Sequence, residues 1–132
     1  MRAVVTVVVL LLVGCGSARE GAPLGCIVHV YFCTDRTCAT AATRGQIGRL
    51  ETQLRARHDV YSVVFVSKKQ ALEIMRKRHP VLVQQLPFNP FPDALRVRPV
   101  KGTSPVLLAS TIAAGQAGVE RVKAVRLARC SA

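Results

Sequence analysis

The five cysteines are the residues of this sequence with the widest range of possible chemistry, because a thiol can be acylated, oxidised to a disulfide or used as a metal ligand. Their positions separate them into groups. Cys15 stands directly after an apolar run, Cys33 and Cys38 lie close together, and Cys26 and Cys130 mark the two ends of the remaining chain. We therefore consider a different chemistry for each group.

The N-terminal segment has the layout of a signal peptide. Arg2 precedes an uncharged run that ends on small residues, and the run is too short to span a bilayer as a helix. The sequence Leu12-Val13-Gly14-Cys15 resembles a lipobox, in which small residues admit the signal peptidase and the thiol accepts a diacylglycerol. We expect a signal peptide at 1–14, lipidation of Cys15 and a lipidated tether at 15–25. A simple secretory signal and an uncleaved anchor are the alternatives.

The other four cysteines favour disulfides, because an even number of thiols in an oxidising compartment usually pairs. Three connectivities are possible. Cys33 with Cys38 would close a small loop, whereas Cys26 with Cys130 would tie the first strand to the end of the domain and contribute on the order of 4 kcal/mol. The spacing of Cys33 and Cys38 is not C-x-x-C, so we expect a structural bridge there and not a redox or metal site.

Catalytic and metal-binding patterns are missing from the sequence. His29, His58 and His79 do not form a pair at metal-ligand spacing, and the 7 acidic residues provide no paired carboxylates. Neither a Gly-rich phosphate loop nor a G-x-S-x-G nucleophile motif occurs. We expect a non-catalytic protein without a metal or cofactor.

The charge balance is strongly basic. The chain has 19 Lys and Arg against 7 Asp and Glu, and loss of Arg2 with the signal peptide would leave a formal charge of +11 on 118 residues. Such a surface favours association with anionic lipid headgroups or anionic wall polymers. Few aromatic residues accompany the basic ones, and the chain is expected outside the cytoplasm, so we do not expect nucleic acid as a partner.

The hydrophobic pattern predicts a single domain of alternating strands and helices. A β-branched run at 26–33 is followed by a helix that Thr40 can cap, in which Ile47, Leu50 and Leu54 recur at helical spacing. The further elements predicted are a strand at 60–66, a helix at 68–79 capped by Ser67, an apolar turn at 81–86, a proline-rich connection at 87–92, a strand at 94–100, a helix at 104–116 and a strand at 119–127.

This order predicts an α+β fold, a ferredoxin-like split βαβ sandwich. The usual hairpin between the second and third strands would be opened by a helical and proline-rich insertion. That insertion is the unusual part of the predicted fold.

Three segments together resemble the extracellular domain of the FtsX family, a permease-like cell-division protein. They are Val30-Tyr-Phe-Cys-Thr-Asp35, Val63-Val-Phe-Val-Ser-Lys-Lys-Gln-Ala-Leu72 and Asn89-Pro-Phe-Pro-Asp-Ala-Leu-Arg-Val97. The similarity covers most of the mature chain, so 26–130 is expected to be an FtsX extracellular-like domain. In that family the domain lies between transmembrane helices, whereas here Cys15 would replace them as the membrane anchor.

The resemblance implies a domain that docks an envelope protein, namely a peptidoglycan hydrolase or its activator. An accessory outer subunit of a transport or permease complex is the alternative. The candidate partner-binding residues are the apolar ones of the insertion: Leu72, Met75, Leu82, Val83, Leu86 and Phe88. Packing of the insertion onto the sheet is the competing interpretation for them, especially for Leu72 and Leu86, and a solvated face is the expected role of the basic residues at 68–78.

Overall fold

The computed structural model describes residues 18–113, 116–125 and 128–130. The predicted signal peptide and Cys15 lie outside these residues. Within them, no helix is both long and apolar enough to span a bilayer.

The described residues form one four-stranded antiparallel sheet in the order β2-β3-β1-β4. Along the chain the elements are β1 (Val28–Phe32), α1 (Arg44–Arg55), β2 (Val60–Val66), α2 (Lys68–Arg78), α3 (Pro80–Gln84), β3 (Ala94–Pro99), α4 (Pro105–Ala113) and β4 (Val119–Ala124), with a final 3-10 turn at Ala128–Cys130. Strand β3 lies between β1 and β2 and pairs with both, as a split βαβ topology requires. The predicted ferredoxin-like class is confirmed.

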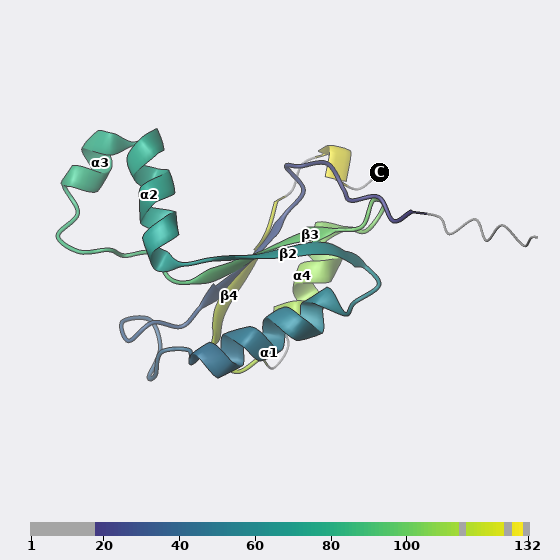
Figure 1. Cartoon of the computed structure of the whole chain (residues 1–132), viewed down its shortest axis with the longest axis horizontal. Helices are drawn as coiled ribbons and strands as arrows, with labels where there is room; N and C mark the ends of the chain where they lie inside the picture. Colours follow the sequence, from purple (N-terminus) through teal and green to yellow (C-terminus); the bar gives the residue numbers. More distant parts are fainter. Residues whose placement is uncertain (1–17, 114–115, 126–127, 131–132) are drawn as a thin grey trace, which may run out of the picture.

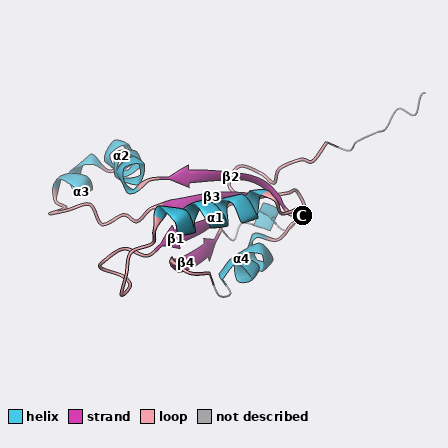
Figure 2. Cartoon of the chain, turned by 60° about the horizontal axis from the view of Figure 1, so that its bottom comes forward, coloured by secondary structure: helices cyan, strands magenta, loops and turns pink. Residues whose placement is uncertain are grey.

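Two helices, α1 and α4, cover the same face of the sheet (Figures 1 and 2). Strand β1 directs Val28, Val30 and Phe32 to this face, and each is at most 1 % exposed. The rest of this core comprises Ile47, Leu50 and Leu54 of α1, Val60 and Val63 of β2, Leu95 and Val97 of β3, and Leu108, Ala109 and Ile112 of α4. Burial of this continuous apolar layer is the main stabilising contribution to the sandwich.

The first helix starts later than the sequence analysis placed it. Thr43, and not Thr40, is the N-cap residue, and its Oγ1 accepts a hydrogen bond from the Gln46 N–H at 3.2 Å. Gln46 Oε1 in turn accepts from the Thr43 N–H at 2.8 Å. This reciprocal capping box requires a Gln or Glu three residues after the cap, which Thr43 has and Thr40 lacks.

The segment after Pro80 and the end of the last strand also differ from the prediction. The segment expected as a turn contains the short helix α3, since Pro80 suits the first position of a helix. Helix α4 is described as far as Ala113, whereas strand β4 ends at Ala124, before the predicted end at 127, since Val125 is not part of the strand. Residues 114–115 and 126–127, which the predictions included, lie outside the described part of the chain.

The four cysteines, for which the sequence allowed three connectivities, form two disulfides. Cys26 bonds to Cys130 next to Ala22, and this small buried cluster fixes the two ends of the domain to each other. Cys33 bonds to Cys38 and closes the loop that leaves β1. The first bridge therefore constrains the whole domain, whereas the second constrains one loop.

Replacing both Cys26 and Cys130 by Ala should lower the free energy of unfolding by about 4 to 5 kcal/mol, because that bridge joins residues 104 apart. The matched Cys33→Ala, Cys38→Ala variant opens a loop with a separation of 5 and should lose about 2 kcal/mol. Urea unfolding of both variants measures the difference. A larger loss for the short-loop variant would contradict this account of the two bridges.

Candidate functional site

The insertion between β2 and β3, here called the lobe (residues 67–93), projects from one end of the sheet (Figure 1). The β2–β3 ladder continues to the pair Val66 and Ala94, so the lobe leaves and rejoins the sheet at neighbouring positions. Its two helices pack mainly against each other. None of its residues belongs to the core under the sheet. The lobe is therefore a separate packing unit.

The base of α2 is fixed by a capping box and by the returning chain. Ser67 caps the helix as predicted, with its Oγ accepting from the Gln70 N–H at 3.2 Å. The Lys68 N–H donates to Asp93 Oδ1 at 2.7 Å, and the Lys68 carbonyl accepts from Asn89 Nδ2 at 2.9 Å. Asn89 Oδ1 also accepts from the Phe91 N–H at 3.0 Å, which shapes the proline-rich segment. These hydrogen bonds close the lobe at its base.

The change of direction between α2 and α3 is set by one proline. The ring of a proline disfavours the helical backbone conformation for the residue before it. His79, which precedes Pro80, has φ −139° and ψ 65° and is therefore not helical. Helix α2 therefore ends at Arg78, and Pro80 opens α3. The two short helices form a helical hairpin that neither could stabilise alone.

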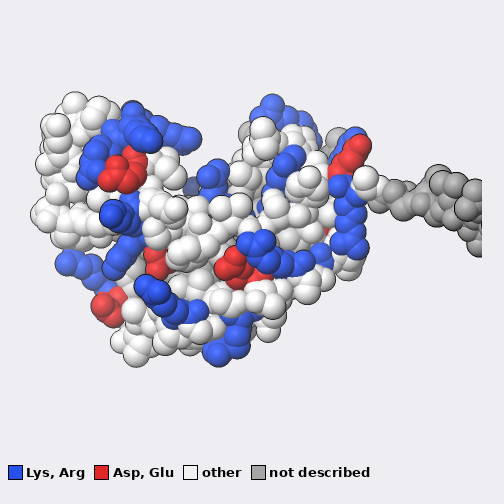
Figure 3. All heavy atoms as spheres, viewed as in Figure 1, with Lys and Arg blue, Asp and Glu red and all other residues white. Residues whose placement is uncertain are grey.

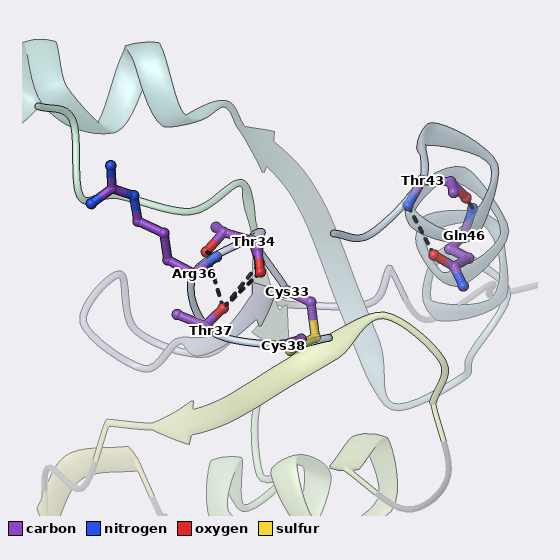
Figure 4. Close-up of a disulfide and its surroundings, with 7 residues drawn as sticks. All are labelled: Cys33, Thr34, Arg36, Thr37, Cys38, Thr43 and Gln46. Atoms are coloured by element: carbon purple, nitrogen blue, oxygen red, sulfur yellow. Dashed lines mark hydrogen bonds between the residues drawn. A yellow bond between two sulfur atoms is a disulfide. The ribbon is translucent and has the colours of Figure 1, made fainter. Parts of the chain in front are cut away.

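The Cys33–Cys38 loop supports the lobe from the side. Thr34 and Thr37 are hydrogen bonded to each other within this loop, and the Arg36 side chain extends from it toward the chain that returns from the lobe (Figure 4). The Arg36 guanidinium carbon lies 3.6 Å from the centroid of the Phe88 ring. This cation–π contact joins the disulfide loop to the lobe, a connection that sequence reasoning did not anticipate.

The predicted partner-binding residues divide into three groups by exposure. Leu82 and Phe88 are 53 % and 44 % exposed. Leu72, Met75 and Leu86 are half-buried. Val83 is buried, so it packs inside the lobe and the prediction that it forms part of the accessible surface is revised.

Sequence reasoning missed two exposed apolar residues of the lobe. Val81 is 66 % exposed and Ile74 is 38 % exposed. Ile74 was detectable as a large apolar residue on the same predicted helix as the candidates Leu72 and Met75. Val81 lies in the same predicted turn as the candidates Leu82 and Val83 but was not included with them. With Leu82 and Phe88, these residues define the apolar lobe surface.

A shallow groove runs along the junction of α2 with the edge strand β2. Its lining includes Val64 and Phe65 of β2 and Ile74 of α2. Both β2 residues are exposed, Val64 at 54 % and Phe65 at 38 %. The remaining lining residues are Val66, Lys69, Gln70 and Glu73. The groove therefore extends the apolar lobe surface toward the sheet.

Basic residues surround this apolar surface. The exposed cations of α2 are Lys68, Lys69, Arg76, Lys77 and Arg78, of which Arg76 pairs with Glu73. Figure 3 shows blue side chains spread over the lobe among residues without charge, which are drawn white. The surface thus combines apolar contact area with positive charge.

A second arginine–carboxylate pair has a structural role. Arg57 donates to both carboxylate oxygens of Asp59, at 2.8 and 2.7 Å, and also to Thr111 Oγ1 at 2.9 Å. The hydrogen bonds from Arg57 hold the pKa of Asp59 below its ordinary value, against the opposing effect of burial. The pair therefore ties the start of β2 to α4. Among the residues that the structure describes, no cluster of three metal-ligating side chains occurs.

The sheet order and the projecting lobe define an α+β domain of the ferredoxin-like class, and the family follows from the sequence match. The chain belongs to the FtsX extracellular domain family, whose model matches residues 26–129. These are non-catalytic domains of a cell-division protein. No curated protein matches the chain in sequence.

Two solved structures share the fold. One is extracellular domain 1 of FtsX from S. pneumoniae in complex with undecyl-maltoside, at 23 % identity and a TM-score of 0.51, with 76 % of this chain and 95 % of that chain covered. The other is the solution structure of the large extracellular loop of FtsX in Streptococcus pneumoniae, at 23 % identity and a TM-score of 0.53, with 75 % and 98 % covered.

Asn89→Ala should loosen the lobe without unfolding the sheet. The change removes the hydrogen bonds of Asn89 to Lys68 and Phe91, so opening of α2 and α3 should become easier by about 1 to 2 kcal/mol. Amide hydrogen exchange should accelerate in 68–84 and stay unchanged in β1. Gln85→Ala, an exposed change in the same returning segment, is the control. Equal exchange in both variants would show that Asn89 does not hold the lobe.

Proposed function

We propose that the chain is a membrane-tethered binding domain whose lobe docks a peptidoglycan hydrolase, or the activator of one, during cell division. The domain itself performs no catalysis in this proposal. Its tether is the lipid on Cys15, which holds it at the extracytoplasmic face of the cell membrane.

The observation that carries this proposal is the apolar lobe surface. Val81, Leu82 and Phe88 are large apolar residues that remain 44 % to 66 % exposed on one small unit. The sheet offers the lobe no burial, because its core is already filled by α1 and α4. Several large apolar residues left exposed on one small unit are typical of a protein-binding site.

The shape of this surface suits a helix of the partner. An amphipathic helix can place its apolar side chains in the groove between β2 and α2, where Phe65 and Ile74 lie. Lys69 lines the same groove, and the other exposed cations of α2 favour a partner with acidic residues beside its apolar stripe. Extracellular domain 1 of FtsX from S. pneumoniae forms a complex with undecyl-maltoside, an amphiphile with an alkyl chain, which supports a site for apolar groups on a domain of this fold.

Substitutions at the start of α3 test the docking surface. Val81→Glu with Leu82→Glu should weaken hydrolase binding by about tenfold or more, because two exposed apolar contacts would be replaced by charges. Co-purification of the full chain with the hydrolase from membranes, followed by titration of the purified pair, measures the loss.

The chain supplies a matched control for this pair. Helices α3 and α4 both begin with Pro-Val-Leu, and Val106 and Leu107 of α4 are exposed as well, at 40 % and 68 %. Val106→Glu with Leu107→Glu makes the same chemical change away from the lobe and should leave binding intact. Retention of the hydrolase by the α3 variant, or equal losses in both, would exclude the lobe as the docking surface.

Cys15→Ala should release the domain from the membrane without affecting its fold. The two acyl chains at a lipidated cysteine give stable anchoring, whereas electrostatic attraction of a basic domain is screened by salt. Fractionation in high salt, with circular dichroism of the released protein, measures both properties. A variant that stays with the membrane in high salt would refute lipidation of Cys15 as the anchor.

A further inference from the structure

The face of the sheet opposite α1 and α4 carries a row of aligned side chains across all four strands. Strand pairing places Val64 opposite Arg96, Arg96 opposite His29 and His29 opposite Lys123. Since Val28 and Val30 face the core, His29 between them faces the other side. The imidazole therefore lies between two cations contributed by neighbouring strands.

Two further arginines enlarge this positive region. Arg121 is on β4 opposite Tyr31, and its guanidinium carbon lies 4.8 Å from the Tyr31 ring centroid. Arg98 is on β3, 5.0 Å from the ring of Tyr61, and donates from Nε to the Ala22 carbonyl at 2.6 Å. The aromatic rings and the carbonyl position these guanidinium groups, which leaves their other N–H groups for a ligand.

The positive charge of this face is not neutralised within the described part of the chain. The ion pairs found there join Arg55 to Glu51, Arg57 to Asp59, Arg76 to Glu73 and Lys101 to Glu20. None of them includes Arg96, Arg98, Arg121 or Lys123. The pKa of His29 is lowered by burial and then by the charges of Arg96 and Lys123, which reports the same positive potential at the centre of the row.

The face also lies in a hollow. A pocket beside β2 and β3 is lined by Leu24, Ile27, Ser62, Val64, Arg96 and Arg98, so the N-terminal segment borders the sheet there. Figure 1 shows the lobe rising at the other end of the sheet, and Figure 3 shows the resulting hollow with blue side chains at its edges. A flat bilayer surface cannot enter such a hollow, whereas a linear chain can.

We propose that this sheet face binds a linear phosphodiester polymer outside the cytoplasm, with one phosphate over His29 between Arg96 and Lys123. Planar guanidinium groups match phosphate oxygens in pairs of hydrogen bonds, and three of the four cations are arginines. Side chains two residues apart on a strand, such as Arg96 and Arg98, are separated by about 7 Å and can engage successive charges of one polymer. This binding is separate from the lobe and adds a second contact with the envelope.

Charge-matched variants of the full chain in detergent micelles test this proposal. The probe is fluorescently labelled poly(glycerol phosphate). Arg96→Gln with Lys123→Gln should weaken its binding by about tenfold or more. Arg44→Gln with Arg49→Gln removes the same charge from exposed positions of α1, on the opposite face, and should change binding less than about twofold. Arg96→Lys with Lys123→Arg keeps the charge and should retain binding.

Two further readouts test the position of the bound anion and the identity of the occupant. The polymer should raise the pKa of His29, measured by NMR titration, because its negative charge offsets the Arg96 and Lys123 charges that lower it. Equal losses for the sheet-face and α1 variants would overturn the proposal. It would also be overturned if phosphatidylglycerol vesicles or polyglutamate bound the sheet face more tightly than the phosphodiester polymer, since a membrane or an acidic protein segment would then be the occupant.

Discussion

The backbone of Lys68 is held on both sides by the chain that returns from the lobe, and this closure determines how the molecule is divided. Asp93 accepts from its N–H and Asn89 donates to its carbonyl. Because the lobe is closed at this point, β2 and β3 pair as far as Val66 and Ala94 as though the insertion were absent. The sheet can thus form a complete ferredoxin-like sandwich while the lobe keeps its own apolar residues outside the core. The exposed surface of the lobe is a consequence of this division.

The sandwich has helices on one side only, and that asymmetry gives the domain two different surfaces. Helices α1 and α4 cover the apolar side of the sheet. Its residues are therefore buried and stabilise the fold, and they are not accessible to a ligand. The lobe supplies apolar contacts, whereas the uncovered side of the sheet supplies the cations around His29. The two surfaces therefore suit ligands of different chemistry, an apolar protein segment on the lobe and a polyanion on the sheet.

The sequence was sufficient for the topology because strand and helix periodicities are strong in β1, α1 and β2, and Ser67 with Gln70 is a clear helix start. It misplaced the start of α1, since Thr40 and Thr43 are both acceptable caps and only Gln46 distinguishes them. Helix α3 was missed because Pro80 ends one helix and begins another, and a turn has the same signal.

The candidate site was less predictable than the fold. Apolar residues of the insertion could be named, but Val83 and Leu82 are neighbours with opposite exposure, which depends on how α3 packs against α2. The contact between Arg36 and Phe88 joins segments far apart in the chain, so it cannot be predicted from a local sequence pattern. The cationic row on the sheet follows from strand register, which a single sequence does not specify.

The central claim is that the apolar lobe surface docks a cell-wall hydrolase or its activator in the intact envelope, and site-specific photocrosslinking in cells tests it most directly. A photoreactive amino acid would replace Leu82 on the lobe or Leu107 on α4, which are both exposed. The account predicts a crosslink from position 82 to one hydrolase or hydrolase activator and none to it from position 107. The same crosslink from both positions, or none to such a protein from position 82, would contradict it.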